Sequence, residues 1–217
     1  MKVPVLIPVN RLERAKGRLA SLLSAEERLT LALITLETVL RAAGPSSVVL
    51  TADRRVAEAA AGKARILDEA PDLQGLNAQL EAALATLVAD GTAKDGVLIL
   101  HADLPLATNE AIENVVAMAR PNSITVVESR DGGTNAMLLE PPGEFPLAYG
   151  PASFALHTAA ARQAGMHVSA NPNRELSLDL DTPDDIVELL RPPRGRQGAA
   201  GRYLLSIGVE ARLAARA

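Results

Sequence analysis

The fold prediction rests on one stretch of the chain, Val97-Leu98-Ile99-Leu100-His101-Ala102-Asp103-Leu104-Pro105. Four apolar residues with turn formers on both sides are typical of a fully buried strand in a parallel sheet. Asp103 follows just past the end of this strand, at the carboxyl edge, where open α/β sheets bind ligands. An aspartate in that position also often caps the next helix or closes a turn, so Asp103 needs support from other residues.

Apolar runs and amphipathic segments alternate on both sides of this strand, which predicts a three-layer, doubly wound α/β fold with a mostly parallel sheet. Two later strands, Ser123 to Val127 and Asn135 to Leu139, are joined by a segment too short for a helical crossover, so we expect them to be antiparallel neighbours. The other predicted strands are Val3 to Pro8, Val48 to Thr51, Arg65 to Leu67, His167 to Ala170 and Leu176 to Asp181.

Length and composition favour one domain. With 217 residues and 48% hydrophobic content, the chain can bury one full core, and we expect a single domain over residues 1–190. Residues 191–217 hold six arginines and one glutamate, and could form a terminal helix, a contact in a homodimer or a partly disordered tail. The net charge of −4 argues against general nucleic-acid binding. No stretch has the length of a membrane span and no export signal is visible, which predicts a cytoplasmic protein.

Carboxylates dominate the candidate metal ligands. The chain has no cysteine and three histidines, so a bound metal would be held mainly by oxygen, which points to Mg²⁺ or Mn²⁺ rather than zinc. In Leu176 to Asp181 the residue types alternate, which places Asp179 and Asp181 on one face of the predicted last strand, roughly 7 Å apart and able to share one cation. The alternative is that Asp181 caps the helix that begins at Thr182-Pro183, and that Asp179 is simply exposed.

A basic loop follows the first predicted strand. The segment Val9 to Gly17 lacks helical periodicity, and four cations lie close together at Arg11, Arg14, Lys16 and Arg18. Such a cluster suits an anion such as a triphosphate, although a solvated basic loop remains open.

Asn77 lies in the first turn of the helix that carries Leu76, Leu80, Leu84 and Leu87. It either caps that helix or marks a helix start that presents amides to a base or a phosphate.

Three of the four aromatic residues, Phe145, Tyr149 and Phe154, fall within ten positions, with His157 close behind. This clustering indicates either a shaped pocket wall or a small satellite core under a loop. Gly150 and Pro151 lead into a helix for which we predict Ser153 as the cap, at a start that can hold a phosphate or a carboxylate.

The usual phosphate-loop, dinucleotide-binding, zinc and nucleophile-elbow motifs are absent from the sequence. The basic loop, Asp103 and the Asp179–Asp181 pair suit a metal-dependent nucleotidyl transfer. In that chemistry cations bind the triphosphate, carboxylates hold the metal, and the charge at the α-phosphorus is neutralised as a bound anion attacks.

Six segments, in matching order over about residues 3 to 190, together resemble the 2-phospho-L-lactate guanylyltransferase family of coenzyme F-420 biosynthesis. They are Pro8 with Ala15-Lys16-Gly17-Arg18-Leu19, Leu76-Asn77, Ala102-Asp103-Leu104-Pro105, Gly133-Thr134-Asn135-Ala136, Tyr149-Gly150 with Ser153-Phe154 and His157, and Asp179-Leu180-Asp181-Thr182-Pro183 with Asp185.

The resemblance implies a nucleotide-diphospho-sugar-transferase-like, MobA-like fold that joins GTP to a small phosphorylated acid and releases pyrophosphate. It implies metal binding by Asp103, Asp179 and Asp181, a phosphate-binding loop at Lys16 and Arg18, and an acceptor pocket at Thr134, Gly150 and Ser153. We predict in addition that Arg11 and Asn77 bind the nucleotide, that Tyr149 lines the acceptor pocket, and that Asp103, Lys16 and Arg18 act in catalysis. Among bacterial relatives the acceptor is expected to be phosphoenolpyruvate first, 3-phospho-D-glycerate second and 2-phospho-L-lactate third.

Two positions depart from the family pattern. Asn10 stands where a lysine is usual, and Gly17 where a serine is usual, so one phosphate contact is either missing or supplied by Arg11. Other functions also stay open: transfer to another acceptor by a MobA-like enzyme, a non-catalytic nucleotide-binding module, and a Mg²⁺-dependent phosphatase of the haloacid-dehalogenase type. Asp179-Leu180-Asp181-Thr182 resembles the nucleophile motif of those phosphatases, although that motif normally ends an early strand.

Overall fold

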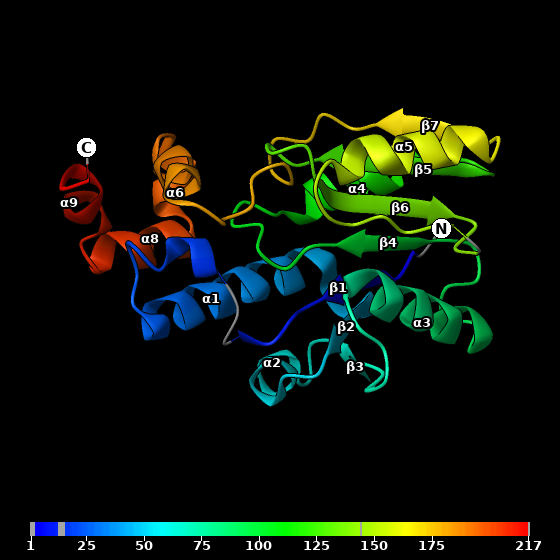
Figure 1. Ribbon diagram of the computed structural model, residues 1–217, viewed down its shortest axis with the longest axis horizontal. Helices are drawn as coiled ribbons and strands as arrows, with labels where there is room; N and C mark the ends of the chain where they lie inside the picture. Colours follow the sequence, from blue (N-terminus) through cyan, green and yellow to red (C-terminus); the bar gives the residue numbers. More distant parts are fainter. Residues whose placement is uncertain (1–2, 13–15, 144, 217) are drawn as a thin grey trace.

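The computed structural model describes residues 3–12, 16–143 and 145–216, and Figure 1 shows a single twisted sheet flanked by helices. The sheet has seven strands in the order β3-β2-β1-β4-β6-β5-β7. The short 3₁₀ helices η2 (Gly17–Leu19) and η3 (Gly44–Ser46) lie in connections. The strands are β1 (Val5–Pro8), β2 (Ser47–Thr51), β3 (Arg65–Asp68), β4 (Val97–Leu100), β5 (Ser123–Glu128), β6 (Thr134–Glu140) and β7 (His167–Ala170).

One strand reverses the polarity of the sheet. β1 pairs in parallel with both β2 and β4, whereas β6 pairs antiparallel with both β4 and β5. The predicted antiparallel pairing of the two later strands is therefore confirmed. Because β6 runs the other way, its amino-terminal end lies at the same edge as the carboxyl ends of β1 and β4. Residues from all three strands can meet there.

The alternation of side chains along each strand divides the core between the two faces of the sheet. On one face Ile7 packs under α1 (Ala25–Ala43), α2 (Arg54–Ala60) and α4 (Asn109–Val116). On the other face its neighbour Leu6 packs under α3 (Leu76–Ala89), and α5 (Ser153–Gln163) covers the same face through Ala161. The architecture is the predicted three-layer, mostly parallel α/β fold.

The last part of the chain forms short helices that gather at one end of the molecule, away from the sheet (Figure 1). Leu204 and Val209 join the buried cluster around Leu31 of α1. Gly195 allows the close approach of this segment, because a Cβ there would lie 1.8 Å from the carbonyl oxygen of Leu189. The domain boundary at residue 190 stays a prediction. The helices are α6 (Pro183–Leu190), α7 (Pro193–Gln197), α8 (Ala199–Ser206) and α9 (Val209–Ala214).

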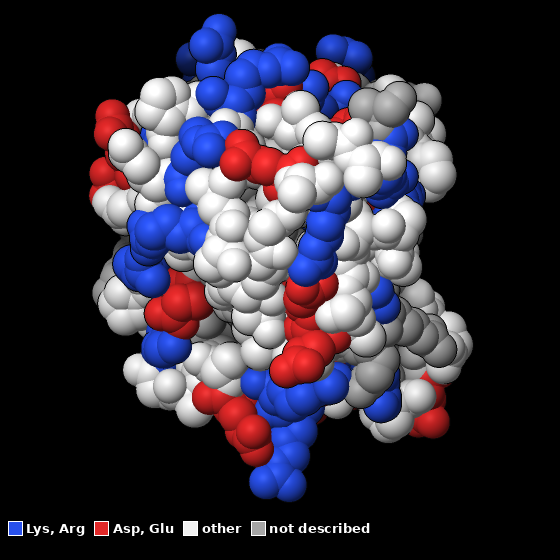
Figure 2. Space-filling view, turned by 90° about the vertical axis from the view of Figure 1, so that its left-hand side faces the viewer, with Lys and Arg blue, Asp and Glu red and all other residues white. Residues whose placement is uncertain are grey.

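Several arginines of this segment form ion pairs with acidic side chains. Arg194 pairs with Glu175 and Arg196 with Glu210, both through N–O contacts shorter than 3 Å. Figure 2, which views the molecule from this end, shows Lys and Arg side chains interspersed with acidic and uncharged residues. Among the residues described, no helix combines the length and apolar character that crossing a membrane requires.

The prediction of a last strand over Leu176 to Asp181 is wrong. This segment has no regular secondary structure, and Leu180 donates a single backbone hydrogen bond to the carbonyl of Asp103. The reason is that β4 already pairs with β1 on one side and β6 on the other, so no edge is open beside it. The predicted alternation nevertheless holds, since Leu178 and Leu180 are buried while Asp179 and Asp181 face a cleft.

The predicted cap of α5 is also wrong. The helix begins at Ser153, and the capping position is Ala152, which adopts a left-handed conformation with φ of 57°. The Ser153 hydroxyl donates instead to the Thr134 hydroxyl oxygen. The other predicted capping box, Ser24 with Glu27 at the start of α1, is confirmed.

Candidate active site

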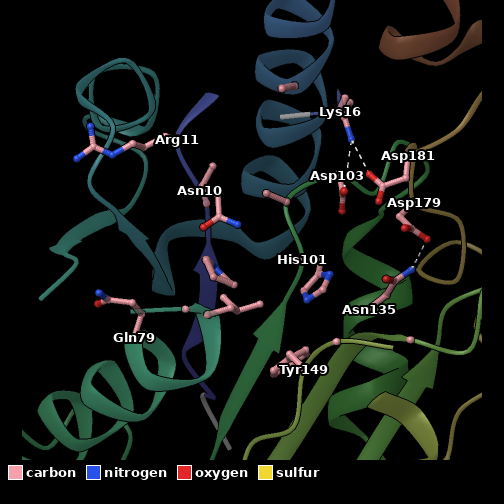
Figure 3. A pocket seen from close by; sticks show the side chains of 18 of the residues that line it. Asn10, Arg11, Lys16, Gln79, His101, Asp103, Asn135, Tyr149, Asp179 and Asp181 are labelled. Carbon is pink, nitrogen blue, oxygen red and sulfur yellow. Dashed lines mark hydrogen bonds and ion pairs between the residues drawn. The ribbon is translucent and has the colours of Figure 1, made fainter. Parts of the chain in front are cut away.

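A cleft of about 1160 Å³ opens at the edge of the sheet where β1 and β4 end. β1 connects to β2 on one side and pairs with β4 on the other, so this edge is the switch point at which α/β sheets bind ligands. The first wall comes from the loop after β1 and from residues 69–79. The second comes from the end of β4, the start of β6 and the segment around Asp179 (Figure 3).

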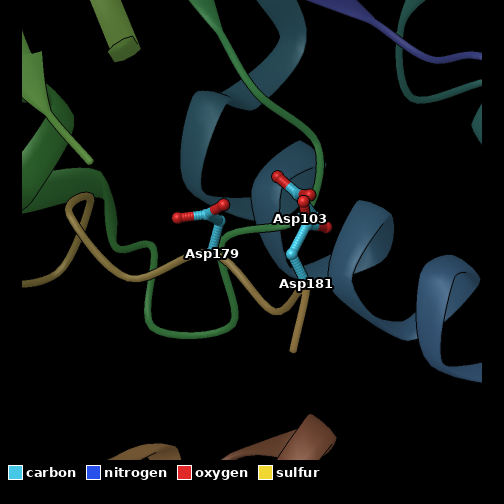
Figure 4. Close-up of side chains that lie close together, drawn as sticks. All are labelled: Asp103, Asp179 and Asp181. Carbon is cyan, nitrogen blue, oxygen red and sulfur yellow. The ribbon is translucent and has the colours of Figure 1, made fainter. Parts of the chain in front are cut away.

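Three carboxylates converge in this cleft. One oxygen each of Asp103, Asp179 and Asp181 lies within 4.8 Å of the others, and Figure 4 shows the three side chains side by side. Asp103 follows β4, while Asp179 and Asp181 lie on the irregular segment that Leu178 and Leu180 anchor in the core. The backbone bond from Leu180 to Asp103 joins the two segments.

Burial and mutual repulsion hinder ionisation of Asp179 and Asp181. Burial, together with the charge of Asp103, raises the pKa of Asp179 to about 6. The pKa of Asp181 is raised by the same two causes. Oδ1 of Asp103 is buried and makes no hydrogen bond within the described part of the chain. The cluster is therefore a site of concentrated negative charge that a cation would stabilise.

Lys16 supplies one positive charge to the cluster from the opposite wall. Its Nζ donates to the carbonyl oxygen of Leu180 at 2.8 Å and to Oδ2 of Asp103 at 3.3 Å, and lies 3.9 Å from Oδ1 of Asp181. The residue is buried, with a left-handed backbone at φ of 53°. Burial opposes the ionisation of Asp103, but the charge and hydrogen bond of Lys16, the charge of His101 and a backbone hydrogen bond together outweigh burial and lower the pKa of that carboxyl.

The donor set fits a divalent cation with oxygen ligands. Three carboxylates and one ammonium leave excess negative charge, and the unpartnered Oδ1 of Asp103 offers a lone pair inside the cluster. Mg²⁺ and Mn²⁺ prefer such oxygen ligands. Asp103, Asp179 and Asp181 are the residues that would hold the ion.

The basic loop forms part of the first wall. Arg11 and Arg18 are exposed and line the cleft, whereas Arg14 lies outside the described residues. Asp53 anchors this loop, because its carboxylate accepts a 2.8 Å hydrogen bond from the backbone N–H of Leu12. This bond anchors the backbone next to Arg11. Of the two departures from the family pattern, Asn10 lines the cleft and Gly17 begins η2.

Asn77 does not line the cleft. Its side-chain amide donates to the carbonyl of Tyr149 and accepts from the N–H of Tyr149, at 3.1 and 2.8 Å. Gln79, two residues later, holds the segment before α3 through three hydrogen bonds to the backbone of Ala70 and Leu73. Asn77 thus ties the two walls together, and a direct contact with nucleotide stays a prediction.

Thr134, Tyr149, Gly150 and Ser153 all line the second wall. The first amides of α5 are already used, since Ser153 donates to the carbonyl of Gly150 and Phe154 to that of Gly132. The side chains here are therefore better placed than that helix start to bind an anion. The Tyr149 hydroxyl is buried without a partner in the described chain, and burial raises its pKa, so it remains a protonated donor.

Some residues of the site were not singled out in the sequence. Asn135 is buried at the start of β6, and its amide donates to Oδ1 of Asp179 at 3.2 Å. His101 lines the cleft between Asp103 and Tyr149, as Figure 3 shows, and its ring centroid lies 5.4 Å from that of Tyr149. Both residues stand inside segments quoted from the sequence, His101 directly before Ala102-Asp103 and Asn135 within Gly133-Thr134-Asn135-Ala136, so membership of these segments was the available signal.

A family model described as "Guanylyl transferase CofC like" matches residues 3–216 of the chain. The chain belongs to this CofC-like guanylyl transferase family. One curated relative, the phosphoenolpyruvate guanylyltransferase of Sphaerobacter thermophilus, is 36% identical over 195 residues, covering 87% of this chain and 93% of the relative. The 2-phospho-L-lactate guanylyltransferase of Methanocaldococcus jannaschii is 26% identical over 211 residues, covering 97% and 91%.

Solved structures agree with this fold. A Desulfovibrio desulfuricans G20 protein assigned as a nucleotide-diphospho-sugar transferase superimposes with a TM-score of 0.78 at 16% identity, covering 98% of this chain and 96% of the other. A cytidylyltransferase from Leptospira borgpetersenii gives 0.58 at 13% identity, with 98% and 96% covered. These likenesses establish the predicted nucleotide-diphospho-sugar-transferase-like fold of this CofC-like chain. The phosphatase alternative is not favoured, because its motif lies after the last strand.

Proposed function

We propose that this CofC-like protein transfers the guanylyl group of GTP to a small phosphorylated acid in coenzyme F-420 biosynthesis, with Mg²⁺ or Mn²⁺. The observation that carries the proposal is the carboxylate cluster of Asp103, Asp179 and Asp181 facing a basic loop within one cleft. A triphosphate needs cations around it, and a divalent ion held by carboxylates neutralises charge at the α-phosphorus.

The reaction balances as a displacement at the α-phosphorus of GTP. A phosphate oxygen of the acceptor forms a bond to this phosphorus, the bond to the β-phosphate oxygen breaks, and pyrophosphate leaves with that electron pair. Arg11, Lys16 and Arg18 would bind the triphosphate and stabilise the departing charge. The metal would supply electrostatic stabilisation of the phosphoryl oxygens.

For the acceptor we propose phosphoenolpyruvate first, 3-phospho-D-glycerate second and 2-phospho-L-lactate third. Curated relatives carry the names of guanylyltransferases for the first and the third of these acids. Thr134, Tyr149, Gly150 and Ser153 are proposed to bind it, because hydroxyls at one wall of the cleft suit a carboxylate and a phosphate.

The test is incubation with GTP, Mg²⁺ and each acid in turn, with pyrophosphate and the guanylylated acid as readouts. We expect both products with at least one acid, and none without metal. Turnover only with a molybdenum cofactor or a sugar phosphate would mean that the proposed acceptor is wrong and that the proposed guanylyl transfer is right. Phosphate release without nucleotide would indicate a phosphatase, and GTP binding without pyrophosphate release a binding module.

A further inference from the structure

A fully buried histidine lies directly behind the proposed acceptor wall. His157 of α5 has no exposed surface, and its Nδ1 lies 3.1 Å from the Thr134 hydroxyl oxygen. Its other nitrogen, Nε2, lies 2.9 Å from the backbone nitrogen of Ala148. The ring is enclosed by Tyr149 at 4.8 Å and Phe145 at 6.1 Å between centroids. Both ring nitrogens are therefore used by protein groups.

The backbone contact fixes the tautomer of this ring. A backbone N–H can only donate, so Nε2 of His157 must present its lone pair to Ala148. Burial, together with the nearby His101, lowers the pKa of His157 to about 4, which keeps the ring neutral at physiological pH. The proton of the neutral ring then lies on Nδ1, which donates to the Thr134 oxygen.

The positions of the hydrogens decide whether this wall can donate hydrogen bonds to a ligand, and this donor or acceptor character is its polarity. The hydroxyl oxygens of Ser153 and Thr134 are 3.3 Å apart, and one of their two hydroxyl hydrogens is used in the bond between them. Neither hydrogen can point to His157, because that contact is filled by the Nδ1 proton. One hydroxyl hydrogen is left over, and the described residues offer it no acceptor. Since both side chains line the cleft, this hydrogen is available to a ligand there.

We infer that His157 is a positioning residue that makes the Thr134–Ser153 pair a hydrogen-bond donor to an oxygen without hydrogen, a carboxylate or phosphate oxygen of the acceptor. The assignment of that ligand rests on the proposed function. The donor character of the pair rests only on the contacts among Ala148, His157, Thr134 and Ser153. A histidine with the opposite tautomer would instead have consumed the Thr134 hydrogen and weakened the wall as an anion site.

The tautomer can be measured without activity. In ¹⁵N-labelled wild-type protein at pH 7, the ring nitrogens of His157, assigned by their loss in His157→Gln, should show a protonated Nδ1 and an unprotonated Nε2. Protonation on Nε2 would overturn the inference.

The functional consequence is tested with a double-mutant cycle of His157→Leu and Thr134→Val. With GTP, Mg²⁺ and phosphoenolpyruvate, we expect each single variant to raise the KM for phosphoenolpyruvate by about 10-fold, as for the loss of one hydrogen bond to a charged group, and to leave the KM for GTP nearly unchanged. If His157 acts through Thr134, the double variant should be no worse than Thr134→Val. Additive effects, or equal losses for both substrates, would contradict this role.

The proposed function and the role of His157 can fail separately. If the wild-type protein turned over GTP with none of the three acids, the proposed function would be wrong, and the ¹⁵N measurement would still decide the polarity. If turnover occurred but the tautomer or the cycle disagreed, the proposed function would stand without this role for His157.

Discussion

Nζ of Lys16 lies 3.3 Å from Oδ2 of Asp103, a contact between residues 87 positions apart in the sequence. This contact places the buried ammonium group of Lys16 beside a proposed metal ligand rather than in open solvent. One side chain thereby links the two walls of the cleft, and a ligand bound between them would contact both charges.

Replacing Lys16 with Ala should raise the KM for GTP, lower turnover, or do both, because the ammonium balances charge in the ground state and as pyrophosphate departs. Steady-state kinetics with GTP as the varied substrate check this. The control is Lys94→Ala, a lysine that lies outside the cleft. Normal GTP kinetics in Lys16→Ala would mean that the ammonium has no part in the reaction.

Asp→Asn at Asp103, Asp179 or Asp181 removes a charged ligand and keeps the shape of the side chain. We expect activity to fall by several orders of magnitude with the thermal midpoint retained, and Mg²⁺ or Mn²⁺ binding to weaken. Pyrophosphate release and metal titration are the measurements, and the exposed Asp184→Asn is the matched control. Near-full turnover in the Asp179 or Asp181 variant would refute the metal site.

Asn135→Ala should weaken metal binding and activity by about 10- to 100-fold, as is typical when a partner of a metal ligand is lost. The amide of Asn135 lowers the pKa of Asp179, which burial and Asp103 raise to about 6. Removing it should raise that pKa further, so the acidic limb of the pH–activity profile should move to higher pH. An unchanged pH–activity profile would show that Asn135 does not influence the ionisation of Asp179.

Ser153→Ala should raise the KM for the phosphorylated acid more than the KM for GTP, since the Ser153 hydroxyl lies on the wall away from the basic loop. The comparison requires both substrates to be varied in turn. A larger effect on GTP than on the acid would place Ser153 at the nucleotide instead.

Arg212→Leu should destabilise the protein, because it removes a bidentate pair with Glu27 that joins α9 to the capping box of α1. Hydrogen bonds from Arg212 and from Ser24 lower the pKa of Glu27 from 4.5 to about 2. This stabilisation is complete above pH 4.5 and is lost as pH falls towards 2, so the difference from wild type should shrink in that range.

Urea unfolding at pH 7, 4 and 3 measures this difference. The exposed Arg54→Leu, whose arginine pairs with Glu58 on α2, is the control and should cost less. An Arg212→Leu variant equal to Arg54→Leu at pH 7 would mean that the pair contributes nothing specific.

Local chemistry determined much of the fold. The apolar run at 97–100, the capping box at Ser24 and Glu27, and the short link between β5 and β6 each act over a few residues, and each is found as predicted. The alternation in residues 176–181 also held, because burying leucines on one side requires no partner strand.

Tertiary structure decided the rest. Whether residues 176–181 form a strand depends on an open sheet edge, and β1 and β6 occupy both sides of β4. The position of Lys16 among the carboxylates and the bond from Asn135 to Asp179 depend on partners far away in the sequence. The tautomer of His157 depends on how α5 packs against the loop before it. Residue types and spacing thus determined which charges the site contains. Only packing decided which atoms meet, because a side chain's partners are set by the elements that fold against it.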